Sequence, residues 1–152
     1  MKAFTFRLQT LLHLRELARD QSLESYGKSI EEFNRLGESL HAQEKQLQEL
    51  QSYIKHKRSS GFYGQDEQNH QRTVVDSKNK IIELHGELQN AKKIQEAKRT
   101  IFLKSDADFK SLEKLKGKQQ KEHSYNEQKK EENEIDDIIT SRFAYNLNSQ
   151  LS

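Results

Sequence analysis

Proline and cysteine are both absent from this chain of 152 residues, and each absence narrows what the chain can be. A proline inside a helix costs about 3 kcal/mol, so the absence of proline favours long uninterrupted helices. Without cysteine, disulfides and thiolate metal sites are excluded, which fits a reducing compartment. No apolar run approaches the roughly 18 residues that span a bilayer, and residues 1–10 lack the apolar core of a signal peptide. The expected location is the cytoplasm.

Apolar residues are also scarce, at 32% of the chain against 33% charged residues. Compact domains carry roughly 45–50% apolar residues, so this chain cannot fill a round core. The composition therefore predicts an all-α fold of long helices, each buried along one stripe. The 26 basic and 24 acidic side chains are interspersed and leave a formal charge of +2, which gives no large field for nucleic acid. Nucleic acid is not an expected partner.

The stretch from Tyr26 to Ile54 carries the clearest pattern, because apolar residues recur there at every seventh position. This repeat keeps a narrow stripe on one side of an under-wound helix, and the stripe must meet a partner helix. The repeating residues are Tyr26, Phe33, Leu40, Leu47 and Ile54, with Leu23 and Ile30 at alternating positions. The same alternation puts Gly37, Glu44 and Gln51 in the seam, with Leu36 and Leu50 one residue earlier and able to turn into the same groove. The pattern predicts a loose coiled-coil seam.

Local signals predict one hairpin domain over residues 1–152, with a first helix at about 6–58, a turn at 59–65 and a second helix at about 66–147. Thr5 is the expected N-cap, since its hydroxyl can accept from an early helical N–H. The cationic run at 55–58 suits the negative end of the helix dipole. Two serines and two glycines in the next segment favour a turn.

A turn centred on Phe62 sets the register, because opposite residues in an antiparallel hairpin then have numbers that sum to about 124. Apolar residues match under this rule. The predicted pairs are Leu12 with Leu112, Leu23 with Ile101, Ile30 with Ile94, Phe33 with Ala91 and Leu40 with Leu84. The start of the first helix falls opposite residue 118, so the second helix has no partner beyond it.

The overhang that results is polar on every side from Lys116 to Asn133 apart from Tyr125, and an apolar stripe follows it. The stripe consists of Ile135, Ile138, Ile139, Phe143 and Leu147. A short exposed apolar stripe on a solvated arm is a candidate binding surface. The alternative is a frayed terminus.

Residue patterns for catalysis, cofactors or metals are not found in the sequence. The six glycines are scattered and form no phosphate-binding loop. Of the six histidines, the hairpin brings only His56 and His70 near each other, too few ligands for a metal site. Asp136 and Asp137 lie among other acids, and we interpret them as a solvated face because nothing supplies a pocket that would raise a pKa. We expect no enzyme activity, no cofactor and no metal.

Two sequence blocks lie near the ends of the chain. The first block runs from Phe4 to Leu12 and continues with Arg15 and Glu16. The second consists of residues 112–115 with Gln119, Glu122, Asp136, Asp137, Ile138, Arg142 and Phe143. Together these blocks resemble the FliJ family of flagellar export proteins. Gly117 departs from the charged residue expected in the second block, and a glycine inside a helix costs about 1 kcal/mol relative to alanine.

This resemblance implies a long antiparallel two-helix coiled coil that acts as a stalk on the hexameric ATPase of the flagellar type III export apparatus. It also implies contacts with the export gate, a membrane protein, and with export chaperones, so that association with the inner membrane would be peripheral and through partners. The residues expected to contact the ATPase by charge are Arg7, Arg15, Lys114, Lys118 and Arg142, with Leu8, Leu11 and Leu115 holding the helices together. Those expected at the gate are Gln71, Val74, Val75 and Lys78.

Two other classes of protein remain open from the sequence. One is a generic coiled-coil adaptor or tethering arm, whose ends would not differ in function from its middle. The other is an enzyme, for which a two-helix rod without a pocket leaves little room. Within the stalk hypothesis, the equivalent stalk of a virulence-type secretion system would share the same shape.

Overall fold

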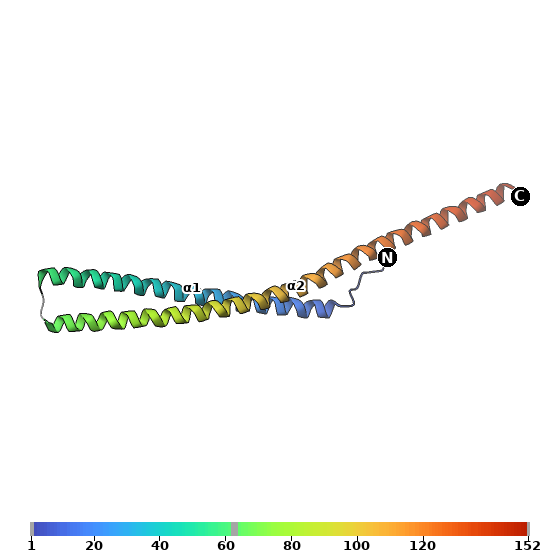
Figure 1. Ribbon diagram of the computed structural model, residues 1–152. Coiled ribbons are helices and arrows are strands. Elements are labelled where there is room, and N and C mark those ends of the chain that lie inside the picture. The colour runs from blue at the N-terminus through green and yellow to red at the C-terminus, as the bar shows by residue number, and fades with distance from the viewer. Residues whose placement is uncertain (1, 62–63, 152) are drawn as a thin grey trace. The chain divides into compact units, whose positions relative to one another are not determined.

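The computed structural model describes residues 2–61 and 64–151, and these form two long helices (Figure 1). Helix α1 spans Gln9–Ser60 and helix α2 spans Gly64–Leu151. The part of the chain that is described contains no strand. The prediction of an all-α chain with two long helices packed against each other is confirmed. Phe62, the predicted centre of the turn, lies outside the described residues.

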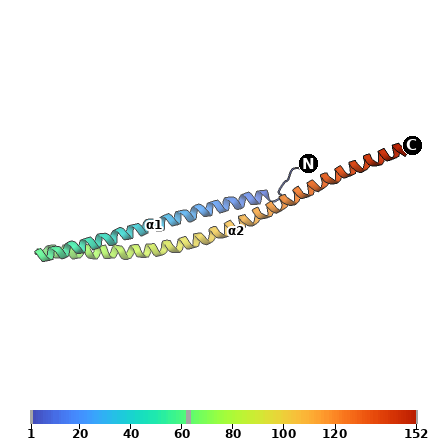
Figure 2. The same ribbon diagram turned by 90° about the horizontal axis from the view of Figure 1, so that it is seen from above.

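The chain divides into two compact units. One, which we call the hairpin unit, is Ala18–Ser105, and the other, the terminal unit, is Met1–Leu17 together with Asp106–Ser152. Within the hairpin unit, α1 and α2 run antiparallel and side by side, as Figures 1 and 2 both show. Within the terminal unit, the start of the chain lies along α2. The expectation of a single domain stays a prediction.

Helix α1 begins three residues later than the predicted Phe6. The backbone N–H of Gln9 donates to the carbonyl of Phe6 at 3.1 Å, and that of Leu12 donates to Leu8 at 2.8 Å. Phe6 is buried to 8% exposure against α2, and the chain reaches this position by leaving the helical path. The N-cap prediction for Thr5 is therefore wrong.

Helix α1 ends at a glycine, as the sequence predicts, but slightly later than residue 58. The hydroxyl of Ser59 donates to the carbonyl of His56 at 2.6 Å inside the last turn. Gly61 then has a φ of 83°, the left-handed conformation that only glycine adopts at little cost. Helix α2 begins at Gly64, two residues before the predicted start, and runs unbroken through Gly117 to Leu151.

The seam of the hairpin unit follows intervals of three and four residues along α1. Leu40 and Ile54 are buried, and Tyr26, Phe33 and Leu47 are partly buried, as predicted. The alternating seam positions are Ser29, Leu36, Gln43 and Leu50, all buried or partly buried. The prediction for Glu44 and Gln51 is wrong, because both side chains are exposed, whereas Ile30 and Gly37 are partly buried beside the seam. Leu36 and Leu50 turn into the groove, as the sequence analysis allowed, and the Glu44 carboxylate stays in solvent, where it carries no burial cost.

The register agrees with the predicted sum at both ends and shifts in the hairpin unit. Leu12 and Leu112 share one buried cluster in the terminal unit, and Arg58 pairs with Glu67 near the tip. Tyr26, however, stacks on Phe102, with ring centroids 6.1 Å apart, four residues beyond the predicted position 98. Because of this shift, Ile94 and Ile101 lie outside the seam, each 54% exposed, and do not pair with Ile30 and Leu23 as expected. Within the described residues, neither helix has a stretch long and apolar enough to cross a membrane.

Candidate functional site

The terminal unit is built from both sequence blocks, which meet in one buried cluster. Phe6 and Leu12 come from the start of the chain, and Phe109 and Leu112 come from α2. All four side chains are 6–8% exposed, and Phe4 and Leu8 pack against them. Burying each such side chain contributes roughly 1.5–3 kcal/mol, so this cluster fixes the start of the chain on α2.

Three polar contacts extend this attachment along α2. Arg15 Nη1 donates to the carbonyl oxygen of Asp108 at 3.0 Å, and Lys116 Nζ donates to Gln9 Oε1 at 2.8 Å. His123 Nε2 donates to the carbonyl oxygen of Lys2 at 2.9 Å. The ring of Phe4 also lies 5.6 Å from that of His123. The extended residues 2–8 thus cover α2 as far as His123, so the prediction that α2 is unpaired beyond residue 118 is wrong by about one turn.

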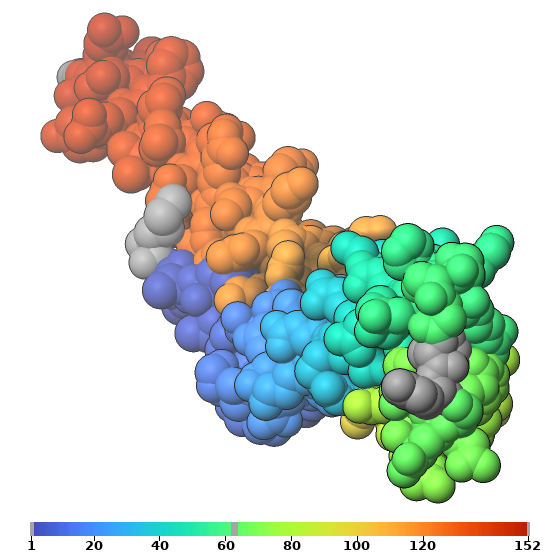
Figure 3. Space-filling model, turned by 90° about the vertical axis from the view of Figure 1, so that its left-hand side faces the viewer, coloured from blue at the N-terminus to red at the C-terminus, as the bar shows by residue number. Residues whose placement is uncertain are grey.

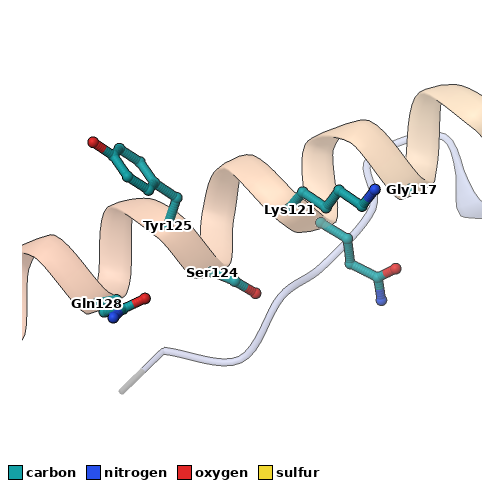
Figure 4. A pocket seen from close by; sticks show the side chains of 6 residues that line it. Gly117, Lys121, Ser124, Tyr125 and Gln128 are labelled. Atoms are coloured by element: carbon teal, nitrogen blue, oxygen red, sulfur yellow. The ribbon is translucent and has the colours of Figure 1, made fainter.

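A shallow hollow lies on α2 beside the N-terminal segment (Figure 4). Gly117 leaves it open on one side, and Lys121, Ser124, Tyr125 and Gln128 supply its polar lining. Tyr125 is 62% exposed, with Lys129 Nζ 5.9 Å from the centre of its ring. Such an open surface does not exclude water from a reacting group.

The residues predicted to contact the ATPase all lie in the terminal unit, but they divide into two kinds. The side chains of Arg7, Lys114, Lys118 and Arg142 are exposed. Arg15 is already held by α2, and Leu8 packs on the buried cluster as expected. Leu11 and Leu115 are 39% and 37% exposed, so they do not hold the helices together. Leu11 lies one residue before the buried Leu12, and Leu115 lies one residue before the partly buried Lys116.

Helix α2 continues past the N-terminal segment with no neighbour among the described residues (Figure 1). Every residue from 128 to 151 is exposed. The predicted apolar stripe is present and solvent-facing, with Ile135 and Ile138 at 54%, Ile139 at 59% and Phe143 at 68%. Two further apolar residues that the sequence analysis missed are more exposed still, Tyr145 at 73% and Leu151 at 80%.

The four residues predicted to contact the gate lie near the tip of the hairpin unit, which faces the viewer in Figure 3. Val74 is buried to 8% in the seam, whereas Val75 is 52% exposed. Gln71 and Lys78 are exposed at the rim of a groove between the two helices. We call it the tip groove, and its lining residues are Gln51, Ile54, Lys55, Arg58, Gln71, Val74 and Lys78.

Helix α1 contributes half of the tip groove, and the sequence analysis did not assign that half. Lys55 and Arg58 were interpreted only as a cationic helix end. The spacing of residues in the sequence could have indicated it. On α1, Gln51 and Arg58 are seven residues apart and flank the seam residue Ile54. On α2, Gln71 and Lys78 flank Val74 at the same spacing.

Ion pairing at the tip involves Arg58 and Glu67, which face each other across the two helices. The hydrogen bond from Arg58 lowers the pKa of the Glu67 carboxyl, partial desolvation acts in the opposite direction, and Gln71 lowers the pKa further. The same hydrogen bond raises the pKa of Arg58. His70, one of the two histidines considered as metal ligands, has its ring 5.9 Å from that of Tyr53. Among residues 2–61 and 64–151, no cluster of three or more histidine, aspartate or glutamate side chains could hold a metal ion.

These features define a class of protein, an antiparallel hairpin of two long helices. A sequence profile described as "Flagellar FliJ protein" matches residues 4–148. The chain belongs to this family. It is 29% identical over 141 residues to the protein named "Flagellar FliJ protein" from Bacillus subtilis (strain 168), covering 93% of this chain and 96% of that relative. No solved structure matches the chain.

Proposed function

We propose that this chain is a non-enzymatic stalk of the flagellar type III protein export apparatus, with its paired termini inserted into the hexameric export ATPase. The observation that carries the proposal is the terminal unit itself. Two sequence blocks that lie about a hundred residues apart are joined there, because Phe6 and Leu12 of the first share a buried cluster with Leu112 of the second and with the neighbouring Phe109. A generic tether would not require both ends of the chain to form one surface.

The charges on the terminal unit suit a contact made of several weak and exchangeable ion pairs. Arg7, Lys114, Lys118 and Arg142 are exposed and free to meet acidic groups on the ATPase. Each exposed ion pair contributes only about 0–1 kcal/mol, so several together bind while each can be exchanged. The exposed leucines Leu11 and Leu115 now belong with these contacts, because they are available to a partner.

The exposed stripe of α2 supplies an apolar component for the same contact. Its side chains, from Ile135 to Leu151, are open to solvent within the terminal unit. An apolar stripe of this kind is stabilised by burial against a partner. We assign it to the interior of the ATPase ring.

The hairpin unit carries the remaining partners in this proposal. Gln71, Val75 and Lys78 near its tip are accessible to the export gate, and the buried Val74 supports them from below. Export chaperones bind the same stalk. The protein is then cytoplasmic and reaches the inner membrane only through the gate.

The experiment that tests this proposal measures stimulation of the purified export ATPase. We expect truncation after Glu113 to reduce stimulation to background while the helical circular dichroism of the remaining hairpin persists. The double variant Lys114→Glu, Lys118→Glu should lower the affinity for the ATPase several-fold without unfolding. A matched control is Lys45→Glu, Lys93→Glu, which makes the same change of charge on exposed residues of the hairpin unit. Full stimulation by the truncated chain would show that the ATPase binds elsewhere.

A further inference from the structure

The tip groove has a floor and a rim of different chemistry. Its floor is formed by the apolar side chains of Ile54 and Val74, which are 4% and 8% exposed, so a narrow apolar strip is open there. The rim carries three cations, Lys55 and Arg58 from α1 and Lys78 from α2, and the amides of Gln51 and Gln71. No acidic side chain lines it. The groove therefore offers positive charge and amide hydrogen bonds on both sides of an apolar strip.

The cations of the rim are not equally available. Arg58 is neutralised by Glu67, which also accepts a hydrogen bond of 3.4 Å from Gln71 Nε2. Within the described residues, Lys55 and Lys78 form no ion pair. The acid one heptad further along the same flank is Glu44, and its carboxylate faces His85 at 3.6 Å. Two lysines from opposite helices are thus left without a counter-charge at the groove.

We propose that the tip groove binds an acidic segment of a partner protein, with a carboxylate between Lys55 and Lys78 and an apolar side chain over Ile54 and Val74. The carboxylate is attracted by both ammonium groups, and the apolar side chain gives the segment a fixed position along the groove. Gln51 and Gln71 donate to the backbone or side-chain oxygens of the segment. The proposal rests on the proposed function in one respect, because the export gate is the expected owner of the segment.

A protein segment fits this groove better than a membrane surface does. Anionic lipids attract cations that project toward a common plane, and an apolar strip recessed between two helices adds nothing to that attraction. A peptide uses both, since it can lower a side chain onto the strip while its charges stay at the rim. The site includes Gln71, Val74 and Lys78 of the four gate residues predicted from the sequence, and α1 adds Gln51, Ile54, Lys55 and Arg58 to them.

The first test measures binding of the purified cytoplasmic domain of the gate to the full chain. We expect Lys55→Glu, Lys78→Glu to weaken binding at least tenfold and Lys55→Arg, Lys78→Arg to preserve it. The control Lys45→Glu, Lys93→Glu should bind like the wild type. All variants change exposed side chains, and circular dichroism verifies that each is folded. Equal affinity of all variants would overturn the proposal while leaving the gate as a partner.

The second test separates the groove from the identity of its partner. The probe is a synthetic peptide with two glutamates flanking a leucine, compared with the same peptide carrying lysines. The glutamate peptide should shift the side-chain amide resonances of Gln51 and Gln71 in the wild type but not in Lys55→Glu, Lys78→Glu. If the gate domain fails to bind the wild type while these shifts occur, the gate assignment fails and the groove stands. No shift with either peptide, or binding only to phosphatidylglycerol vesicles, would overturn the proposal.

Discussion

Two stretches of α2 within the terminal unit carry similar apolar residues, yet only one of them is buried. Phe109 and Leu112 are 8% and 6% exposed, whereas Ile138 and Phe143 are 54% and 68% exposed. The first stretch lies against α1 and residues 2–8, and the second lies against nothing in the described chain. The difference teaches that the length of the first helix and its leading segment, and not the composition of α2, decides which part of α2 is stabilised internally.

The spacing of the two stretches differs as well. Buried positions follow intervals of three and four residues, which keep a stripe facing one partner helix. In the exposed stretch Ile135, Ile139, Phe143, Leu147 and Leu151 form a series four apart, and Ile138 and Tyr145 lie beside this series. Four residues turn a helix by about 40° more than a full rotation, so this stripe winds around the helix. It suits a partner that crosses α2 steeply, or one that surrounds it, better than a second parallel helix.

The largest change in the free energy of unfolding is expected for a substitution in the buried stretch of α2. Leu112→Ala removes a side chain from the cluster and should lower the free energy of unfolding by about 2–4 kcal/mol. Ile138→Ala removes a side chain that is already exposed and should change it by less than about 0.5 kcal/mol. Urea unfolding followed by circular dichroism measures both. Similar losses in the two variants would mean that the exposed stretch has an internal partner.

A second pair of variants extends the comparison to the seam of the hairpin unit. Leu36 is 5% exposed and Leu23 is 48% exposed, although both were candidates for the seam. Leu36→Ala should cost about 2 kcal/mol or more, and Leu23→Ala about 1 kcal/mol or less. Thermal melts of the two variants decide the phase. A greater loss in Leu23→Ala would restore the phase predicted from the sequence.

A substitution that stabilises the fold is expected at Gly117, which lies between the two stretches of α2. An added Cβ there would meet no atom within 4 Å, and the residue is inside a helix. Gly117→Ala should therefore raise the free energy of unfolding by about 0.5–1 kcal/mol. Gly86→Ala, at an equally open helical position in the hairpin unit, is the matched control and should give a similar gain. A loss only at Gly117 would indicate that the N-terminal segment packs more closely there.

A smaller loss is expected where the N-terminal segment ends its contact with α2. Phe4→Ala removes the ring contact with His123 and should lower stability by about 0.5–1.5 kcal/mol. Amide hydrogen exchange in residues 117–123 should become faster in this variant, while exchange in residues 135–151 should not change. Unchanged exchange in both stretches would show that residues 2–8 do not protect α2.

The smallest change in stability is expected from the ion pair between Arg58 and Glu67 at the tip of the hairpin unit, and it gives a reference for the larger changes expected in the terminal unit. The pKa of Glu67 is lowered by the hydrogen bond from Arg58, so this pair stabilises the fold above the ordinary glutamate pKa of about 4.3 and ceases to do so as the pH falls through the lower folded value. Glu67→Gln should melt slightly below the wild type at pH 7, and the difference should shrink as the pH is lowered below the ordinary glutamate pKa. A difference that does not change with pH would assign the effect to packing rather than to charge.

Much of the fold could be predicted from the sequence because long helices leave strong signals. The absence of proline, the glycines after residue 60 and the seven-residue repeat predicted both helices and the turn region between them. The phase of the seam was harder to predict, because two series of positions continue the repeat from Tyr26, one through Ile30 and the other through Leu36. The choice between them depends on what faces them on α2, and the stacking of Tyr26 on Phe102 shifts that alignment by about one turn.

The candidate site was predicted less completely than the fold. Its terminal half followed from the two sequence blocks, but the roles of Leu11 and Leu12 were not distinguished because adjacent leucines satisfy the same pattern. The path of residues 2–8 was missed, since Phe4 and Phe6 were assigned to the entry of a helix. The α1 half of the tip groove was missed because a cationic helix end has a sufficient local explanation in the helix dipole.

The hydrogen bond from Arg15 to the carbonyl oxygen of Asp108 has a consequence for how the terminal unit tolerates change. Every amino acid presents a backbone carbonyl, so the acceptor persists whichever residue occupies position 108, provided that α2 remains helical there. The donor has no such freedom, because a lysine at position 15 would present a single charged nitrogen on a shorter reach instead of a planar guanidinium. A substitution at 108 therefore leaves the acceptor in place, whereas Arg15→Lys would shorten the reach of the donor.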